Sequence, residues 1–302
     1  MEGSCEESVV TAKNCTAKNK EKRRILLPPK GDTMLYNAKN GTIHIGNTEM
    51  DYIRFGTGGK VLVMLPGLGD GLRSVKGTAL PMAVVYRGFA KEFTVYAFSR
   101  KNGLPEGYTT KEMAADQAAA MELLGIPKAD VLGVSMGGMI AQYLAIDYPE
   151  MVGKLTLAVT SARPNPILTE SIGEWVSCAK RGDHTAFMDS NVRRIYSEEY
   201  YRKNRWLVPI MGRLTKPKTY DRFFIQAEAC LKHNAFENLH QIQAPTLVIG
   251  GEKDNTLGGE ASREIAAEIP GAQLRMYEQW GHGLYEEAKD FNQTVLDFLD
   301  AF

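Results

Sequence analysis

The stretch Val131-Leu132-Gly133-Val134-Ser135-Met136-Gly137-Gly138 decides the fold of this 302-residue chain. Gly133 to Gly137 match Gly-x-Ser-x-Gly, the pattern of a sharp turn that carries a serine between a strand and a helix. The flanks agree with that pattern, since 129–134 is a short apolar run and 136–145 is typical of a helix that ends before Pro149. The two glycines allow strand and helix to approach closely, where a side chain would clash. The alternative is an ordinary glycine-rich turn with an incidental serine.

The composition argues against several classes of protein. The chain has 36 Lys and Arg residues against 36 Asp and Glu residues, so its net charge gives no reason to expect nucleic acid or an anionic membrane. No apolar run approaches the length of a membrane span. The four cysteines form no Cys-x-x-Cys pair, which favours a reducing compartment. We therefore expect a cytoplasmic protein, a monomer or homodimer, with neither membrane nor nucleic-acid partner and with no metal or cofactor.

The order of predicted elements indicates an α/β protein. Residues 1–38 are expected to form a disordered extension, because they are polar and aperiodic. A hairpin at 42–45 and 50–55 is followed by apolar strands at 60–65, 94–98, 129–134, 154–159, 245–250 and 273–277, alternating with helices. One of these helices, 110–124, is predicted to begin at Thr110 as its N-cap. This alternation predicts a mostly parallel sheet with helices on both faces, built from 39–163 and 243–302.

Between 164 and 242 the alternation stops. The segment is helical in character and rich in tryptophan, tyrosine and phenylalanine, so we expect a helical cap inserted into the α/β core. An aromatic cap above a site favours a partly hydrophobic ligand. Trp206 and Tyr200 are predicted to line the pocket beneath it.

The serine needs a base, and the base needs an orienting carboxylate. Of five histidines, only His282 follows a sheet strand in a loop with glycine on both sides, and the carboxyl ends of parallel strands meet at one edge of a sheet. The alternative is a surface-loop histidine. The loop after 245–250 offers two acids, Glu252 and Asp254. Asp254 is favoured because it lies further along the loop and has the stiffer side chain.

Acyl transfer also needs donors for a developing oxyanion. The natural pair is the backbone N–H of Met136, directly after the serine, and that of Leu68 in the glycine-rich loop that follows strand 60–65. That loop matches neither glycine-rich phosphate-binding pattern. The alternative to an oxyanion role is that its glycines only form a turn.

The order Ser135, Asp254, His282, together with Gly-Val-Ser-Met-Gly-Gly and Trp-Gly-His-Gly, resembles the α/β-hydrolase superfamily over 39–302, and in particular its single-cap bacterial esterases, lactonases and C–C hydrolases. The resemblance implies an eight-stranded sheet, a cap after the sixth strand and an active site beneath it. Two features depart from the pattern. The chain has Pro66-Gly67 where many relatives have His-Gly, and 99–103 reads Ser-Arg-Lys-Asn-Gly where many have Asp-x-x-Gly-x-Gly-x-Ser.

These residues predict a serine hydrolase that cleaves a small or medium, partly hydrophobic acyl ester, thioester or lactone through an acyl-enzyme on Ser135. An acyltransferase with the same intermediate is one alternative, because sequence does not decide whether water or an alcohol takes the acyl group. A non-catalytic ligand-binding protein with the same fold is another.

Overall fold

The computed structural model describes residues 34–301. Its sheet consists of β1 (Lys39–Ile45), β2 (Thr48–Phe55), β3 (Lys60–Leu65), β4 (Phe93–Phe98), β5 (Ala129–Val134), β6 (Val152–Ala158), β7 (Thr246–Gly251) and β8 (Gln273–Tyr277). The strand order is β1-β2-β4-β3-β5-β6-β7-β8. Only β2 pairs antiparallel, with β1 and β4, and every other pair is parallel. The predicted eight-stranded, mostly parallel sheet is therefore confirmed.

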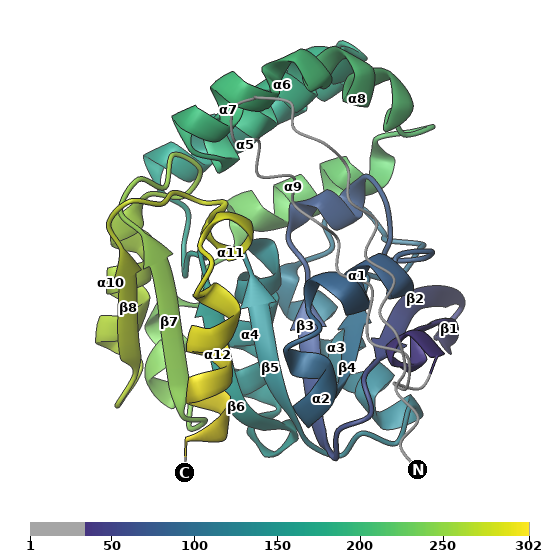
Figure 1. Ribbon diagram of the computed structural model, residues 1–302, viewed down its shortest axis with the longest axis vertical. Coiled ribbons are helices and arrows are strands. Elements are labelled where there is room, and N and C mark those ends of the chain that lie inside the picture. Colours follow the sequence, from purple (N-terminus) through teal and green to yellow (C-terminus); the bar gives the residue numbers. More distant parts are fainter. Residues whose placement is uncertain (1–33, 302) are drawn as a thin grey trace, which may run out of the picture. The chain divides into compact units, whose positions relative to one another are not determined.

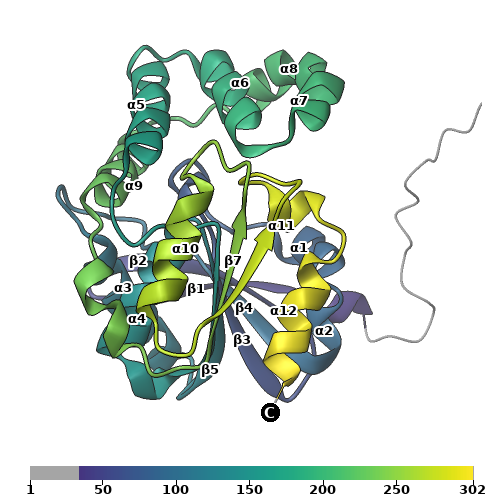
Figure 2. The same ribbon diagram turned by 90° about the vertical axis from the view of Figure 1, so that its left-hand side faces the viewer.

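Helices cover both faces of the sheet. The core helices are α1 (Ala79–Val85), α2 (Phe89–Glu92), α3 (Thr110–Leu123), α4 (Met136–Asp147), α10 (Gly259–Glu268), α11 (Leu284–Glu287) and α12 (Phe291–Asp300). Figure 2 shows α3, α4 and α10 on one face and α1, α2 and α12 on the other. Each face carries its own cluster of buried apolar side chains, as expected for a parallel sheet covered on both sides.

A run of helices separates β6 from β7. It holds α5 (Pro166–Lys180), α6 (His184–Ile195), α7 (Glu198–Asn204), α8 (Val208–Leu214) and α9 (Asp221–Lys232). We call residues 164–242 the cap segment. Figure 1 shows α5 to α8 lying beyond the end of the sheet at which β5 and β7 finish. Short 3-10 helices complete the secondary structure: η1 (Met34–Asn37), η2 (Leu68–Gly71), η3 (Pro149–Met151), η4 (Arg205–Leu207) and η5 (Phe236–Gln241).

Two details differ from the sequence predictions. Residues 1–33 of the expected extension lie outside the described residues, but its end forms η1, where the Tyr36 carbonyl accepts from the Gly56 N–H at 2.7 Å. The N-cap of α3 is Thr109 and not Thr110. Thr109 and Glu112 form a reciprocal capping box, whereas the residue three positions after Thr110 is Met113, whose side chain cannot complete one.

The strands finish in register at one edge of the sheet. Leu65 lies opposite Gly133, Val134 opposite Ala158, and Ala158 opposite Ile249. The loops after β3, β5, β7 and β8 therefore leave the sheet side by side, beneath the cap segment. Within the described part of the chain, no helix is both long enough and apolar enough to cross a membrane.

Candidate active site

Ser135 occupies a strained turn between β5 and α4. Its φ of 55° and ψ of −123° lie in a region that residues other than glycine rarely adopt. Neighbouring groups hold this conformation. The Ser135 N–H donates to the Ala158 carbonyl at 2.9 Å, and the Ser135 carbonyl accepts from the Thr160 hydroxyl at 2.7 Å. The turn thus presents the serine side chain at the edge where the strands end.

The two glycines of the turn are required by close packing, as predicted. A Cβ on Gly137 would lie 1.9 Å from the Leu65 carbonyl oxygen, and one on Gly133 would lie 2.6 Å from the Gly137 carbonyl oxygen. Either contact is far shorter than a real Cβ makes. The first turn of α4 is therefore packed directly against the end of β3.

His282 joins Ser135 to Asp254. The His282 Nε2 lies 3.1 Å from the Ser135 Oγ, and the His282 Nδ1 lies 2.8 Å from the Asp254 Oδ2. A carboxylate only accepts hydrogen bonds, so Nδ1 carries the ring proton and Nε2 is left to accept from the serine. Asp254 and His282 are both buried, which strengthens their interaction. The structure brings together the three side chains that the sequence singled out.

The choice between the two acids follows from their partners. The Asp254 Oδ1 accepts from the backbone N–H groups of Thr256 at 2.8 Å and Leu257 at 2.9 Å, which leaves Oδ2 facing the histidine. Glu252 instead pairs with Arg263 and is partly exposed. Asp254 is therefore the carboxylate that orients His282.

The acid and histidine loops are packed against one another through glycines. A Cβ on Gly251 would lie 2.5 Å from the Trp280 carbonyl oxygen, and one on Gly281 would lie 2.6 Å from the Lys253 carbonyl oxygen. The backbones of these loops are thus in direct contact. This packing fixes the distance from Asp254 to His282.

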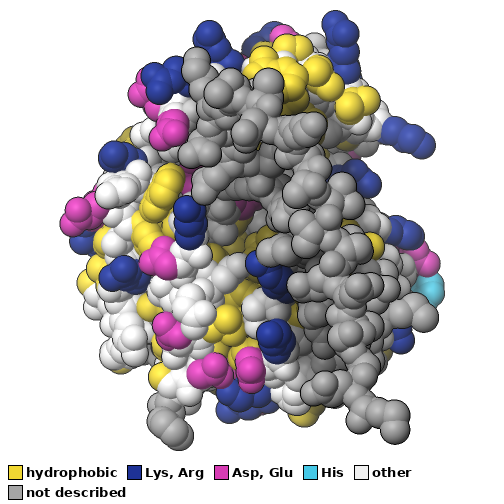
Figure 3. Space-filling model, in the orientation of Figure 1, with side chains coloured by type: hydrophobic (Ala, Val, Ile, Leu, Met, Phe, Trp, Pro, Cys, Tyr) yellow, Lys and Arg dark blue, Asp and Glu magenta, His cyan; other side chains and the backbone are white. Residues whose placement is uncertain are grey.

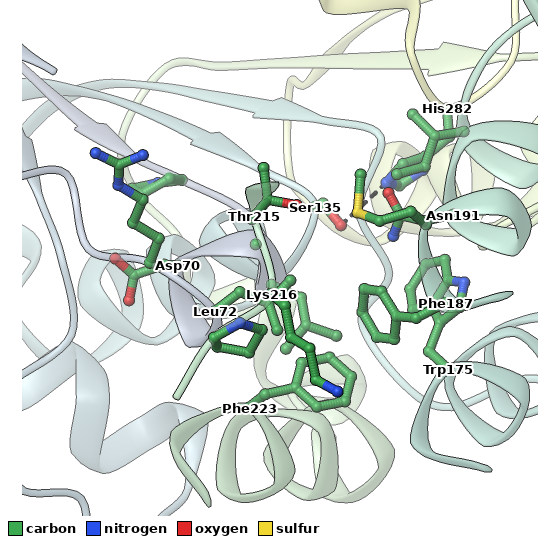
Figure 4. Close-up of a pocket in the computed structure, with 18 of the residues that line it drawn as sticks. Asp70, Leu72, Ser135, Trp175, Phe187, Asn191, Thr215, Lys216, Phe223 and His282 are labelled. Carbon is green, nitrogen blue, oxygen red and sulfur yellow. Dashed lines mark hydrogen bonds between the residues drawn. The ribbon is translucent and has the colours of Figure 1, made fainter. Parts of the chain in front are cut away.

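A cavity of about 820 Å³ opens beside the serine and histidine. Its wall is largely apolar: Leu68, Leu72, Trp175, Phe187, Met188, Ile195 and Phe223 contribute to it. Figure 4 shows Ser135 and His282 on one side, with the rings of Phe187, Phe223 and Trp175 facing the same space. Lys216 and Lys218 add positive charge to the lining. The site therefore suits a ligand with an apolar body.

The predicted pocket role of Trp206 and Tyr200 is wrong. Neither belongs to the cavity lining, and Trp206 is 66% exposed. Tyr200 stacks on Tyr196, which does line the cavity, with ring centroids 4.3 Å apart. Five aromatic residues do reach the cavity: Trp175 of α5, Phe187 of α6, Tyr196 directly after α6, Phe223 of α9 and Tyr285 of α11. The two predicted residues belong instead to α7 and η4.

The two predicted oxyanion donors lie beside the serine. Met136 is the first residue of α4, whose first N–H groups have no partner within the helix, and Leu68 begins η2 and lines the cavity. A Cβ on Gly67 would lie 3.3 Å from the Ser135 Cβ, so the glycine-rich loop rests on the serine. The helix dipole of α4 adds positive potential at the same point.

The two stretches that differ from the usual family pattern, Pro66-Gly67 and 99–103, are in contact in the structure. Arg100, fully buried, donates from Nη2 to the Pro66 carbonyl at 2.6 Å. Its backbone N–H donates to the Asp70 Oδ2 at 3.1 Å, and its carbonyl accepts from Arg222 of α9 at 2.7 Å. Arg222 also pairs with the Asp70 carboxylate at 2.6 Å. Burial lowers the pKa of the Arg100 guanidinium, and Asp70 acts in the opposite direction.

This network ties the oxyanion loop both to the core and to the cap segment. Sequence reasoning missed it, although Arg100 stands in the very stretch that departs from the usual pattern. The available signal was an arginine placed just after the apolar strand 94–98, because an arginine that becomes buried there needs partners.

The buried histidines other than His282 have structural partners. The ring of His233 lies between Thr110 Oγ1 at 2.9 Å and Gln142 Oε1 at 3.3 Å, and burial lowers its pKa to about 3. His184 lies 2.8 Å from the Tyr220 hydroxyl. Across 34–301, no group of three or more His, Cys, Asp or Glu side chains is arranged to hold a metal ion.

A strained serine after a central parallel strand, followed in the chain by its acid and its histidine, is the arrangement of α/β-hydrolases. The family model described as "alpha/beta hydrolase fold" matches residues 60–289. The chain belongs to this family and is a hydrolase.

Relatives of known description agree with this assignment. A 2-hydroxy-6-oxononadienedioate/2-hydroxy-6-oxononatrienedioate hydrolase from a Pseudomonas species is 27% identical, over 86% of this chain and 92% of its own. A putative non-heme bromoperoxidase from Mycobacterium tuberculosis is 30% identical, over 64% of this chain and 76% of its own. Among solved structures, an enol-lactonase from Burkholderia xenovorans superposes with a TM-score of 0.73 at 22% identity, covering 86% of this chain and 100% of its own.

Proposed function

We propose that this hydrolase cleaves a small or medium, partly hydrophobic acyl ester, thioester or lactone through an acyl-enzyme on Ser135. One observation carries the proposal. The hydrogen-bonded chain from Ser135 through His282 to Asp254 faces a largely apolar cavity of about 820 Å³. A nucleophile, a base and an orienting acid beside a cavity of ligand size are the requirements of nucleophilic acyl transfer.

The geometry supports the following steps. The Ser135 Oγ attacks the carbonyl carbon while its proton moves to the His282 Nε2, and the carbonyl π electrons move to the oxygen. Collapse of this intermediate breaks the bond to the leaving oxygen or sulfur, which takes the proton from His282. The acyl group is then an ester of Ser135. Water, deprotonated by His282, repeats the attack and releases the acid and the free serine.

Two sets of groups stabilise the charges that form. Asp254 holds the Nδ1 proton and so favours the imidazolium that His282 becomes. The backbone N–H groups of Leu68 and Met136 are proposed to bind the oxyanion. Because both belong to rigid, closely packed turns, they require little rearrangement when the charge develops.

The apolar lining supports a hydrophobic acyl or ring group in the substrate. The cap segment, 164–242, supplies part of that lining through Trp175, Phe187 and Phe223, and we propose that it selects the substrate. The names of two similar proteins, the enol-lactonase and a putative carbamate hydrolase from Pseudomonas savastanoi, support a substrate with an acyl carbonyl.

A panel of acyl esters, thioesters and lactones of graded acyl length tests the proposal. We expect saturable hydrolysis that Ser135→Ala abolishes and that Ser177→Ala, a change on an exposed part of α5, leaves intact. Added alcohol or thiol acceptors measure how the acyl group is partitioned. A product that is mainly the new ester would make the protein an acyltransferase. A ligand that binds tightly without turnover, with Ser135 unreactive, would make it a binding protein.

A further inference from the structure

The cap segment carries a cluster of apolar side chains that face solvent. Trp206 is 66% exposed, Ile210 47%, Met211 41% and Leu214 77%. We call these four residues the cap patch. Single exposed apolar residues are ordinary on a protein surface, whereas several together mark a surface that is covered by something else. Figure 3 shows hydrophobic side chains gathered beside Lys and Arg side chains at the upper edge of the view, where Figure 1 places α8.

Packing fixes the direction in which the cap patch faces. α8 buries Val208 and Gly212. A Cβ on Gly212 would lie 2.9 Å from the Thr185 Cα, so the backbone of α8 rests directly on α6. With this face of the helix against α6, Ile210, Met211 and Leu214 remain on the outside. Their exposure is therefore a property of the folded cap segment.

The cap patch lies in a locally cationic stretch. From Glu198 to Lys218 there are six Lys and Arg residues against two glutamates, a net charge of +4 in a chain whose net charge is zero. All six cationic side chains are exposed: Arg202, Lys203, Arg205, Arg213, Lys216 and Lys218. Apolar residues among exposed cations are typical of segments that lie on anionic bilayers, and tryptophan favours the headgroup region. The balanced charge of the whole chain, which predicts no membrane partner, conceals this local excess.

A second copy of the chain is a poorer occupant. In a two-fold dimer the cap patch would meet itself, and the six cations of one subunit would face the six of the other. Like charges brought together across an interface oppose association. An anionic lipid surface covers the same apolar side chains and attracts the same cations.

The cap patch also adjoins the mouth of the cavity. Leu214 belongs both to the patch and to the cavity lining, and the lining continues through Thr215 and Lys216 to Lys218. A surface that covers the patch would therefore lie beside the opening that leads to Ser135.

We propose that the cap patch and its flanking cations dock this hydrolase on an anionic lipid bilayer. The docked orientation brings the cavity mouth next to the lipid, so that a hydrophobic acyl substrate reaches Ser135 from the bilayer. This substrate route rests on the proposed function; the docking itself does not.

Sedimentation with vesicles tests the docking without any turnover. We expect the protein to bind phosphatidylglycerol vesicles, and to bind phosphatidylcholine vesicles much more weakly, with binding that declines as salt is added. The double substitution Trp206→Ser and Ile210→Ser should weaken binding about tenfold or more, given the apolar area that it removes. Leu123→Ser removes a side chain that is 60% exposed outside the cap segment and should have no effect.

Two charge-reversal double variants test the contribution of the cations. Arg205→Glu with Arg213→Glu should abolish binding to phosphatidylglycerol, whereas Arg87→Glu with Lys91→Glu, which are also exposed but lie on the core, should reduce it far less. The tryptophan emission should shift to the blue on vesicles, and Trp206→Phe should remove the shift. Hydrolysis of a short, water-soluble ester shows that the variants are folded, since none of these residues lines the cavity.

The proposal is overturned if the protein fails to bind vesicles, if neutral and anionic vesicles bind equally, or if the patch variants bind as well as the wild type. It is also overturned if the Trp206 and Ile210 variant dissociates a dimer, because the cap patch would then be a contact between copies. Failure of the ester panel with intact vesicle binding would refute the proposed function and leave the docking standing.

Discussion

The substitution Asp254→Asn should cripple turnover while preserving the fold. The Asp254 Oδ1 is held by two backbone N–H groups, of Thr256 and Leu257, so an asparagine must keep its carbonyl oxygen there. Its NH₂ group then faces the His282 Nδ1, which has to become the acceptor. The ring proton moves to Nε2, and Nε2 no longer accepts the proton of Ser135. The variant thus stabilises the wrong tautomer of an otherwise intact site.

The size of the expected loss in turnover follows from the parts of the site that Asp254→Asn leaves intact. The cavity and the oxyanion donors are unchanged, so binding should change little and the loss should fall on kcat. In the serine-protease template, the same change costs about 10⁴ in kcat. This corresponds to about 5 kcal/mol in the barrier, at about 1.36 kcal/mol for each tenfold change. The backbone hydrogen bonds to Oδ1 survive, so we expect the free energy of unfolding to fall by only about 1–2 kcal/mol.

The assay compares kcat and KM for one ester in the wild type, Asp254→Asn and Glu252→Gln, with urea unfolding of each. Glu252→Gln removes a carboxylate from the same loop but only breaks the pair with Arg263, so its kcat should stay within about tenfold of the wild type. The reasoning is refuted if Asp254→Asn keeps nearly normal turnover, or if Glu252→Gln is the crippled variant.

Three further predictions concern other parts of the molecule. Arg100→Met should lower kcat by about tenfold to a hundredfold with little change in KM, because the Pro66 carbonyl loses its donor and the oxyanion loop shifts. Lys101→Met is the control. A change confined to KM would contradict the proposed role of Arg100 in positioning the oxyanion loop. Burial lowers the pKa of His233 to about 3, so below pH 6.5 its ring takes up a proton only when the protein unfolds. Its contribution to the free energy of unfolding should therefore fall by about 1.4 kcal/mol per pH unit from pH 6.5 towards 3. His233→Gln should remove that part of the acid sensitivity in denaturant titrations. Phe187→Ala should raise kcat/KM for long acyl chains relative to short ones by about tenfold, whereas Phe224→Ala, outside the cavity lining, should leave the chain-length profile as it is.

The sheet and the central residues of the site were predictable because they depend on local pattern. Apolar runs placed the strands, and parallel strands end at one edge, so Ser135 and His282 had to lie near one another. The glycines on either side of the serine carried the same information, because their lack of a side chain is required by the packing of α4 on β3.

In the cap segment, the pattern of residue types in the sequence was not sufficient to predict which side chains line the cavity. Its aromatic content indicated an apolar pocket, but content does not say which way a helix faces. Trp206 of η4 is 66% exposed, and Ile210 and Leu214 of the neighbouring α8 are exposed because that helix packs on α6 through Gly212, a contact that sequence spacing does not reveal. The network of Arg100, Asp70 and Arg222 is similar, since it joins residues up to 152 positions apart through side-chain contacts. Sequence showed only that the usual residues were missing there.

Covalent labelling of Ser135 tests the central claim most directly. A fluorophosphonate probe should add a single group to the folded protein, and peptide mass analysis should place it on Ser135. Ser135→Ala should take up no label, Asp254→Asn should react far more slowly, and unfolding in urea should abolish the reaction, since an ordinary serine hydroxyl is a poor nucleophile. Labelling at another residue, or undiminished ester turnover by a protein whose Ser135 is fully modified, would contradict the account.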